Sequence, residues 1–128
     1  MIKNFNKGGC LKKNITVFYQ KEFNPYGKYT KDFGKTHTKV YEGVINQDED
    51  QDTVFSAFNG YDTNPLSIAN KTNKVCIVKD KLVTGQEFQE AMKNDEVECG
   101  HTSMSVGDIV AVDGTNYLCK DFGWKELS

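Results

Sequence analysis

The fold is decided by residues 100–124, which read GHTSMSVGDIVAVDGTNYLCKDFGW. Short polar side chains lead into an apolar run over 109–112. Asp113-Gly114 is a pair that hairpin turns prefer, because both residue types tolerate a positive φ. The chain then returns through 117–120, and a last aromatic-rich stretch can continue the sheet or add an edge strand. These residues predict a C-terminal β-hairpin unit.

Three upstream stretches have the composition of strands. Residues 14–20 and 36–45 are rich in β-branched and aromatic side chains, which strands favour. A lysine-rich segment joins them, so we expect the two strands to pair and the segment between them to be exposed. A short apolar run over 74–79 predicts one further strand.

Two helices are indicated by their start signals. The acidic run at 48–52 precedes the apolar residues of 53–59, and carboxylates stabilise the positive end of a helix. Thr84 and Glu87 have the spacing of a capping box, which predicts a helix that ends near Asn94. The predicted fold class is therefore α+β, with a mainly antiparallel sheet and two short helices packed on it.

The length of 128 residues fits one domain. We expect a flexible N-terminal tail over 1–10 and a single α+β domain over 11–128. The sequence has no apolar run long enough to span a membrane and no signal-peptide pattern. This predicts a cytoplasmic protein without membrane contact.

Charge is unevenly distributed along the chain. Residues 1–47 carry nine lysines and three acidic residues, so the remainder is strongly acidic. Arginine is absent, which disfavours sequence-specific reading of DNA bases. The lysines and aromatic residues of 12–41 could neutralise phosphates and stack on single-stranded bases. The competing interpretation is that the aromatic residues are core and the lysines protect strand edges.

The cysteines are candidate metal ligands. The chain has Cys10, Cys76, Cys99 and Cys119, and His101 lies two residues after Cys99. Thiolates and imidazole are ligands for structural zinc, so Cys99, His101, Cys76 and Cys119 form the candidate set. The alternative, which we favour, is that the cysteines are buried as small apolar side chains. No other cofactor is expected.

His101 is also a candidate general base, with Ser103, Ser105 or Asp108 as its partner. The sequence lacks the Gly-x-Ser-x-Gly pattern that frames a nucleophilic serine. The structural alternative is that Ser105 and Asp108 fix a turn while His101 satisfies a loop carbonyl. We expect this structural arrangement and no catalytic residue.

Acidic residues gather in two short stretches that we predict to bind a protein partner. A negative surface associates quickly with a basic groove through electrostatic steering. The candidate partner-binding residues are Asp48, Glu49, Asp50, Asp52, Asp95, Glu96 and Glu98.

The segment from about residue 40 to 127 resembles the YodL-like family of small domains from Gram-positive bacteria, their phages and conjugative elements. The resemblance is carried by VYEG at 40–43, VFSAFN at 54–59, GHTSMSVGDIV at 100–110 and DFGW at 121–124. The family favours Ser where this chain has Gly107 and Phe where it has Trp124. It has no established activity that could be assigned to this chain.

The resemblance implies a gene carried by a phage or mobile element in a bacterial host cell. We therefore predict a non-enzymatic accessory protein that binds and blocks a host protein, such as a defence nuclease. Its specific form would be an inhibitor of host immunity, such as an anti-CRISPR protein. The alternative is a nucleic-acid-binding accessory factor that uses the lysine and aromatic face of 12–41.

Overall fold

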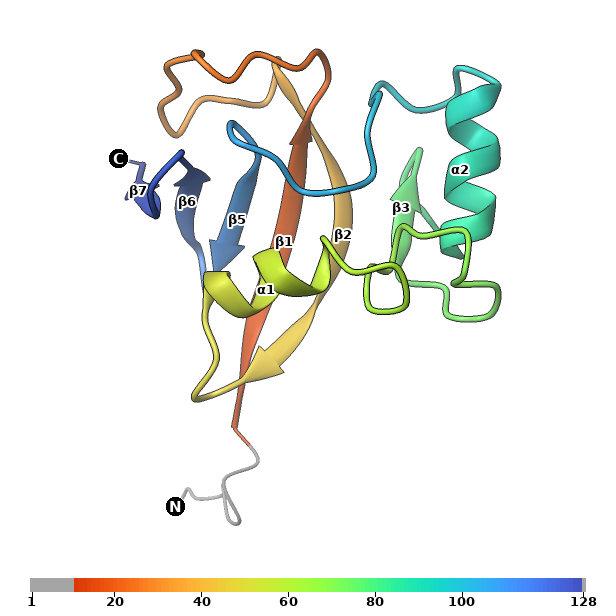
Figure 1. Cartoon of the computed structure of the whole chain (residues 1–128), viewed down its shortest axis with the longest axis horizontal. Helices are drawn as coiled ribbons and strands as arrows, with labels where there is room; N and C mark the ends of the chain where they lie inside the picture. Colours follow the sequence, from red (N-terminus) through yellow and green to blue (C-terminus); the bar gives the residue numbers. More distant parts are fainter. Residues whose placement is uncertain (1–10, 128) are drawn as a thin grey trace.

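The structure, a computed structural model, describes residues 11–127 (Figure 1). Within this range, the strands are β1 (Lys12–Gln20), β2 (His37–Asn46), β3 (Cys76–Val78), β4 (Lys81–Val83), β5 (Ile109–Val112), β6 (Thr115–Cys119) and β7 (Trp124–Glu126), and the helices are α1 (Gln51–Ala57) and α2 (Gly85–Lys93). None of the helices in the described part is both long and apolar enough to cross a membrane. The tail predicted over 1–10 lies outside the described residues.

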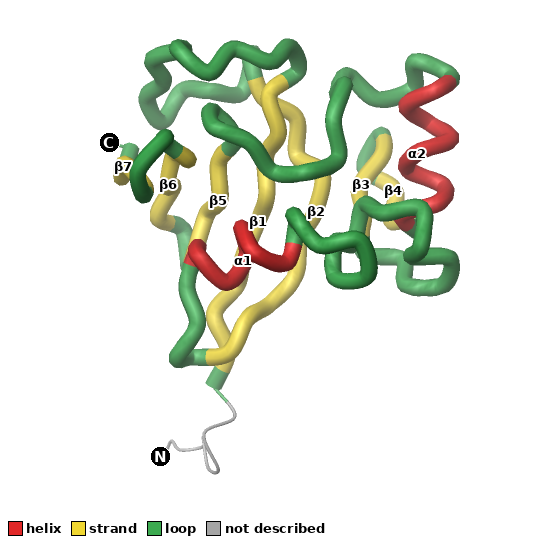
Figure 2. The backbone as a smooth tube through the Cα atoms, viewed as in Figure 1, coloured by secondary structure: helices red, strands yellow, loops and turns green. Residues whose placement is uncertain are grey.

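The strands form one sheet in the order β4-β3-β2-β1-β5-β6-β7, and each neighbouring pair is antiparallel (Figure 2). The predicted α+β class is therefore confirmed. The C-terminal hairpin unit pairs with β1 from Ile15 opposite Val112 to Phe18 opposite Ile109. This pairing places β1 at the centre of the sheet, with β2, β3 and β4 on one side and β5, β6 and β7 on the other.

The two faces of the sheet are covered differently. Val54 of α1 and Phe88 of α2 belong to the same buried cluster as Val17 of β1, so both helices pack on one face. On the other face, a smaller cluster contains Phe33 and Ile109. Phe33 comes from the loop between β1 and β2, and this loop therefore covers part of the second face.

The pairing of the two N-terminal strands is confirmed, with a register irregularity between Val17 and Phe18. The strand predicted over 74–79 is shorter than expected, and β4 was not predicted. β3 and β4 are joined by Lys79 and Asp80, which both have positive φ, 51° and 65°. A lysine gives no signal for that conformation, which explains why sequence patterns missed this hairpin.

The helix boundaries follow the predicted caps. Thr84 and Glu87 form the expected capping box, and Asn94 is the C-cap of α2. Asp50 is the N-cap of α1, where its side chain accepts from the backbone N–H of Asp52. These local hydrogen bonds satisfy backbone groups that have no partner inside the helix.

Candidate functional site

The tight turn that precedes β5 contains a buried carboxylate. Asp108 is 0% exposed. Its Oδ1 accepts a hydrogen bond from the backbone N–H of Gln20 at 2.8 Å, and its Oδ2 accepts one from the backbone N–H of Ser105 at 2.8 Å. The backbone N–H of Asp108 donates in turn to the Ser105 carbonyl at 3.0 Å. The predicted role of Ser105 and Asp108 in fixing a turn is confirmed.

His101 is a further donor to this carboxylate. Its Nε2 lies 2.9 Å from Oδ2 of Asp108 and 3.2 Å from Oδ1. Because a carboxylate only accepts, Nε2 of His101 carries a hydrogen and donates it. The imidazole stacks on Tyr19, with ring centroids 4.6 Å apart. The expectation that His101 satisfies a loop carbonyl is wrong, because the nearby carboxylate is the stronger acceptor.

The serine hydroxyls do not join this pair. The hydroxyl of Ser105 donates to the carbonyl of Ser103 at 3.4 Å. Among residues 11–127, no hydrogen bond connects His101 to the hydroxyl of either serine. The fold therefore orients the imidazole through Asp108 and leaves both serines apart from it.

His37 is a site residue that the sequence analysis missed. It is buried at the start of β2, and its Nε2 lies 2.6 Å from the carbonyl oxygen of Gly107. Its Nδ1 lies 2.9 Å from the hydroxyl of Thr36. Burial lowers the pKa of His37, while the Gly107 carbonyl and the charge of Asp108 oppose this change. No local pattern marks His37, because its partner Gly107 lies 70 residues later.

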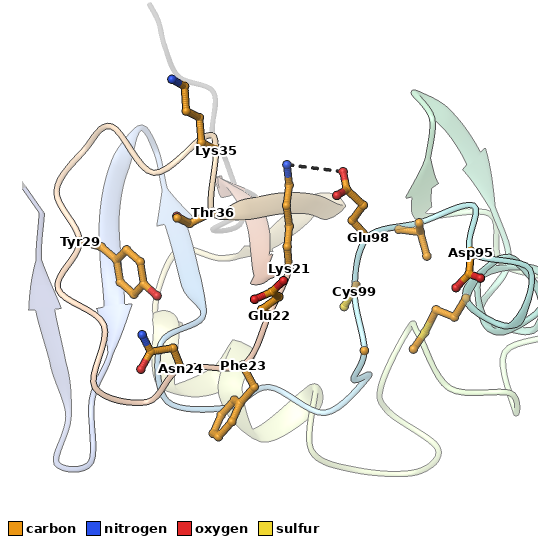
Figure 3. A pocket seen from close by; sticks show the side chains of 13 residues that line it. Lys21, Glu22, Phe23, Asn24, Tyr29, Lys35, Thr36, Asp95, Glu98 and Cys99 are labelled. Atoms are coloured by element: carbon orange, nitrogen blue, oxygen red, sulfur yellow. Dashed lines mark ion pairs between the residues drawn. The ribbon is translucent and has the colours of Figure 1, made fainter.

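A groove with a volume of about 940 Å³ lies beside the turn (Figure 3). One wall comes from the 21–36 loop and the other from the 92–100 segment. Nζ of Lys21 lies 3.6 Å from Oε1 of Glu98, so an ion pair connects the two walls. The Glu98 side chain is 76% exposed, and such a pair contributes little stability. The Lys21–Glu98 ion pair therefore adds little to the stability of the groove walls.

A smaller hollow of about 330 Å³ adjoins the groove and shares Lys21, Phe23 and Gly100 with it. His101 and Ser105 line this hollow as well. Phe23 is 60% exposed between the two cavities. His101, whose side chain bonds the buried Asp108, thus borders the same surface as the groove.

Among the candidate zinc ligands in the described residues, the three cysteines are buried thiols and His101 bonds Asp108. The thiol of Cys76 donates to the Pro65 carbonyl at 3.0 Å, and that of Cys99 donates to the His101 carbonyl at 3.0 Å. Burial raises the pKa of Cys76 to about 12 and those of Cys99 and Cys119 to about 11. Within residues 11–127, no three His, Cys, Asp or Glu side chains meet as a metal site. Cys10 lies outside this range, and the zinc site stays a prediction.

The two acidic stretches occupy different places. In the first stretch, Asp50 caps α1, Glu49 accepts from a backbone amide of β2, and Asp52 accepts from the indole of β7 at 2.8 Å. These carboxylates stabilise the fold, while Asp48 is exposed. In the second stretch, Asp95 and Glu98 line the groove, and Glu96 lies on the neighbouring surface. The second stretch is thus the better placed of the two for contact with a partner.

The lysine and aromatic face predicted over 12–41 is divided between core and surface. Tyr19 and Phe33 are buried, whereas Phe23 and Tyr26 are exposed. The exposed lysines of the connecting loop are Lys28, Lys31 and Lys35. The predicted exposure of this lysine-rich segment is confirmed.

The comparisons with known proteins find a viral relative of this chain. An uncharacterized protein of Acanthamoeba polyphaga mimivirus is 30% identical over 116 residues, which cover 87% of this chain and 88% of the relative. The chain belongs to the family of this mimivirus protein. No protein-family model matches the chain, and no solved structure matches it. The shared length includes most of the chain, so the relationship is one of whole domains.

Proposed function

We propose that this chain is a non-enzymatic accessory protein of a virus or mobile element that binds a host protein through the groove between its 21–36 loop and 92–100 segment. The observation that carries the proposal is that side chains of both charge signs line the groove: Lys21, Glu22 and Lys35 on one wall, and Asp95 and Glu98 on the other. Lys35 lies on one wall and Asp95 on the other, with exposed Phe23 beside them. The mimivirus relative supports a viral setting.

Charge favours a protein partner over a nucleic acid in this groove. A nucleic-acid backbone carries negative charge along its whole length, so the carboxylates of Asp95 and Glu98 would repel it. A protein surface carries both signs and can match both walls. Phe23 supplies an exposed aromatic ring, and aromatic side chains are frequent anchors of protein interfaces.

The bound protein would lose access to its own substrate by occlusion. A host defence nuclease is the partner that we propose, because its basic substrate surface complements Asp95 and Glu98 on the groove wall and Glu96 on the neighbouring surface. An inhibitor of host immunity, such as an anti-CRISPR protein, is the specific form of this proposal. Membership of the YodL-like family, which rests on the motifs at 100–110 and 121–124, is also part of it.

Affinity purification from host cells tests the proposal. The tagged chain is recovered from nuclease-treated extracts, and co-purifying proteins are identified by mass spectrometry. The partner is then purified, and its affinity for Phe23→Ala and Glu98→Lys is compared with that for Tyr61→Ala and Asp62→Lys. The last two are matched controls, because Tyr61 and Asp62 are exposed and do not line the groove.

We expect each groove variant to weaken binding about tenfold or more, equivalent to about 1.4 kcal/mol, while the controls stay within about twofold. Equal effects of groove and control variants would refute the assignment of the groove. The absence of any near-stoichiometric protein, together with unchanged restriction and CRISPR interference in cells, would refute the blocking function.

Nucleic-acid binding is the second candidate, and a separate surface favours it. Tyr26 is 88% exposed, and Lys28 and Lys31 lie on the same loop. An exposed ring that stacks on a base, followed by lysines that contact phosphates, is suited to binding single strands. Filter binding to single strands should then show affinity that falls steeply with salt and is reduced in Tyr26→Ala. Salt-independent or undetectable retention excludes this candidate.

A further inference from the structure

A pocket of about 300 Å³ lies where the loop after α1 meets α2 and residues 102–103. It shares no lining residue with the groove. Its volume is at the lower end of the range of about 300–1,000 Å³ that ligand pockets cover, so it suits one small molecule rather than a peptide. Its lining includes Tyr61, Asn64, Ser67, Ile68, Gln89 and Thr102.

No charged side chain of residues 11–127 lines this pocket, although 27% of the chain is charged. We call it the neutral pocket. A charged ligand that leaves water needs an opposite charge beside it, so phosphates, carboxylates and amines do not match this surface. The polar side chains of the neutral pocket are amides and hydroxyls, which supply both donors and acceptors without charge. The neutral pocket therefore favours an uncharged ligand that is rich in polar groups.

Ser67 is a buried polar residue of the pocket wall and is 7% exposed. Its Oγ accepts from the backbone N–H of Ala69 at 3.1 Å, but within residues 11–127 its hydroxyl donates no hydrogen bond. The side-chain carbonyl of Gln89 accepts no hydrogen bond in this range either, because only the amide is bonded, to the Leu66 carbonyl at 3.0 Å. Buried donors normally have an acceptor. A ligand hydroxyl in the neutral pocket satisfies both groups, since it accepts and donates.

The walls of the neutral pocket are held together by hydrogen bonds of the protein itself. The side-chain amide of Asn64 donates to the Phe58 carbonyl at 2.9 Å and to the Thr102 carbonyl at 2.8 Å. Its Oδ1 accepts from the backbone N–H of Leu66 at 2.9 Å. Asn64 thus connects the end of α1, the following loop and the 102–103 segment. A pocket that is fixed before binding loses less entropy when a ligand enters.

Tyr61 and Ile68 supply exposed apolar surface to the neutral pocket, and their exposed fractions are 69% and 47%. Neither side chain belongs to a buried cluster of the fold. The face of an aromatic ring is negative, and it attracts the C–H groups that a sugar presents on one side of its ring. The hydroxyls at the edge of the same sugar ring match the amides and hydroxyls of the pocket.

We propose that the neutral pocket binds one neutral sugar unit, with Tyr61 against its C–H face and the side chains of Ser67 and Gln89 bonded to its hydroxyls. A nucleotide has a ring that stacks equally well, but the charge of its phosphates finds no partner here. The proposal goes beyond binding of a host protein and does not depend on it, because the neutral pocket and the groove are separate.

Titration of the isotopically labelled full chain with the methyl glycosides of glucose, galactose, mannose and N-acetylglucosamine tests the proposal. We expect at least one of them to shift the backbone amide resonances of 60–68 and 102–103 saturably, with a dissociation constant in the millimolar range. The absence of such shifts with all four glycosides at up to about 50 mM would overturn the proposal. Shifts of these resonances with adenosine and with none of the sugars would also overturn it.

Two variants test the contacts. Tyr61→Ala removes the ring and Gln89→Ala removes the amide, so each should raise the dissociation constant of the sugar about threefold to tenfold. The matched controls are Tyr26→Ala and Gln86→Ala, because both residues are exposed and lie outside the neutral pocket. They should leave the dissociation constant unchanged. Unchanged affinity in Tyr61→Ala, or equal weakening by the controls, would refute the assignment, and no host protein is present to affect this result.

Discussion

Asp108→Asn should destabilise the protein much more than the same replacement at Asp113. Both carboxylate oxygens of Asp108 accept N–H donors, which come from Gln20, Ser105 and His101. An asparagine amide offers one accepting oxygen and one donating nitrogen, so at least one buried N–H loses its acceptor. An unsatisfied buried donor costs about 1–3 kcal/mol, and weaker uncharged hydrogen bonds add about 1 kcal/mol. We expect a loss of about 2–4 kcal/mol in the free energy of unfolding.

Asp113 is the matched control because it also occupies a turn but is exposed. Its Oδ1 accepts from the backbone N–H of Asn14 at 2.8 Å. Asparagine keeps this acceptor and tolerates the φ of 47°, so the change should stay within about 0.5 kcal/mol. Urea unfolding followed by far-ultraviolet circular dichroism gives both values if the slope against urea is unchanged. Equal losses at the two positions, or a loss below about 1 kcal/mol at Asp108, would refute the reasoning.

Gly107→Ala should lower the free energy of unfolding, measured with urea, by about 2 kcal/mol or more. The φ of Gly107 is 98°, and an added Cβ would lie 2.5 Å from Oε1 of the buried Gln20. An unchanged free energy of unfolding would contradict this prediction. Because the pKa of His37 is lowered in the folded state, the unfolded chain binds more protons at acidic pH. The free energy of unfolding should therefore fall as pH drops below about 6.5, and His37 contributes at most about 1.4 kcal/mol per pH unit to this fall. Urea midpoints across pH measure the loss, and His37→Gln should reduce it. Iodoacetamide at about pH 8 should modify Cys76 and Cys99 far more slowly in the native protein than in urea, because burial raises their pKa values to about 12 and about 11. Site-resolved mass spectrometry checks this, and equal native and unfolded rates would contradict it.

Much of the fold could be predicted from short-range signals. The Asp113-Gly114 turn has φ values of 47° and 88°, as its hairpin signal requires, and the box of Thr84 and Glu87 begins α2. Lys79 shows the limit of such signals. Its φ is 51°, but lysine is not a residue type that predicts a positive φ. Turn and cap chemistry acts over a few residues, and it can be recognised in sequence only where the side chains that it needs are present.

The candidate site was predictable only in part. His101 and Asp108 can be recognised as a possible pair from the sequence because they are only seven positions apart. Their other neighbours, Gln20 and His37, lie on strands far away in sequence. The groove walls also come from distant segments, and no pattern in either one indicates that they face each other.

The sequence by itself determined the class of the fold, the hairpin unit, the helix starts and the exposure of the lysine-rich loop, because these depend on alternation and on neighbouring side chains. The tertiary structure alone decided that β5 pairs with β1. That pairing brings the Asp108 carboxylate to the backbone N–H of Gln20, 88 residues away. It also brings His37 to the carbonyl of Gly107 and His101 to the side chain of Asp108 in the same turn. Such contacts are selected by burial of the whole sheet, which no local stretch of sequence encodes.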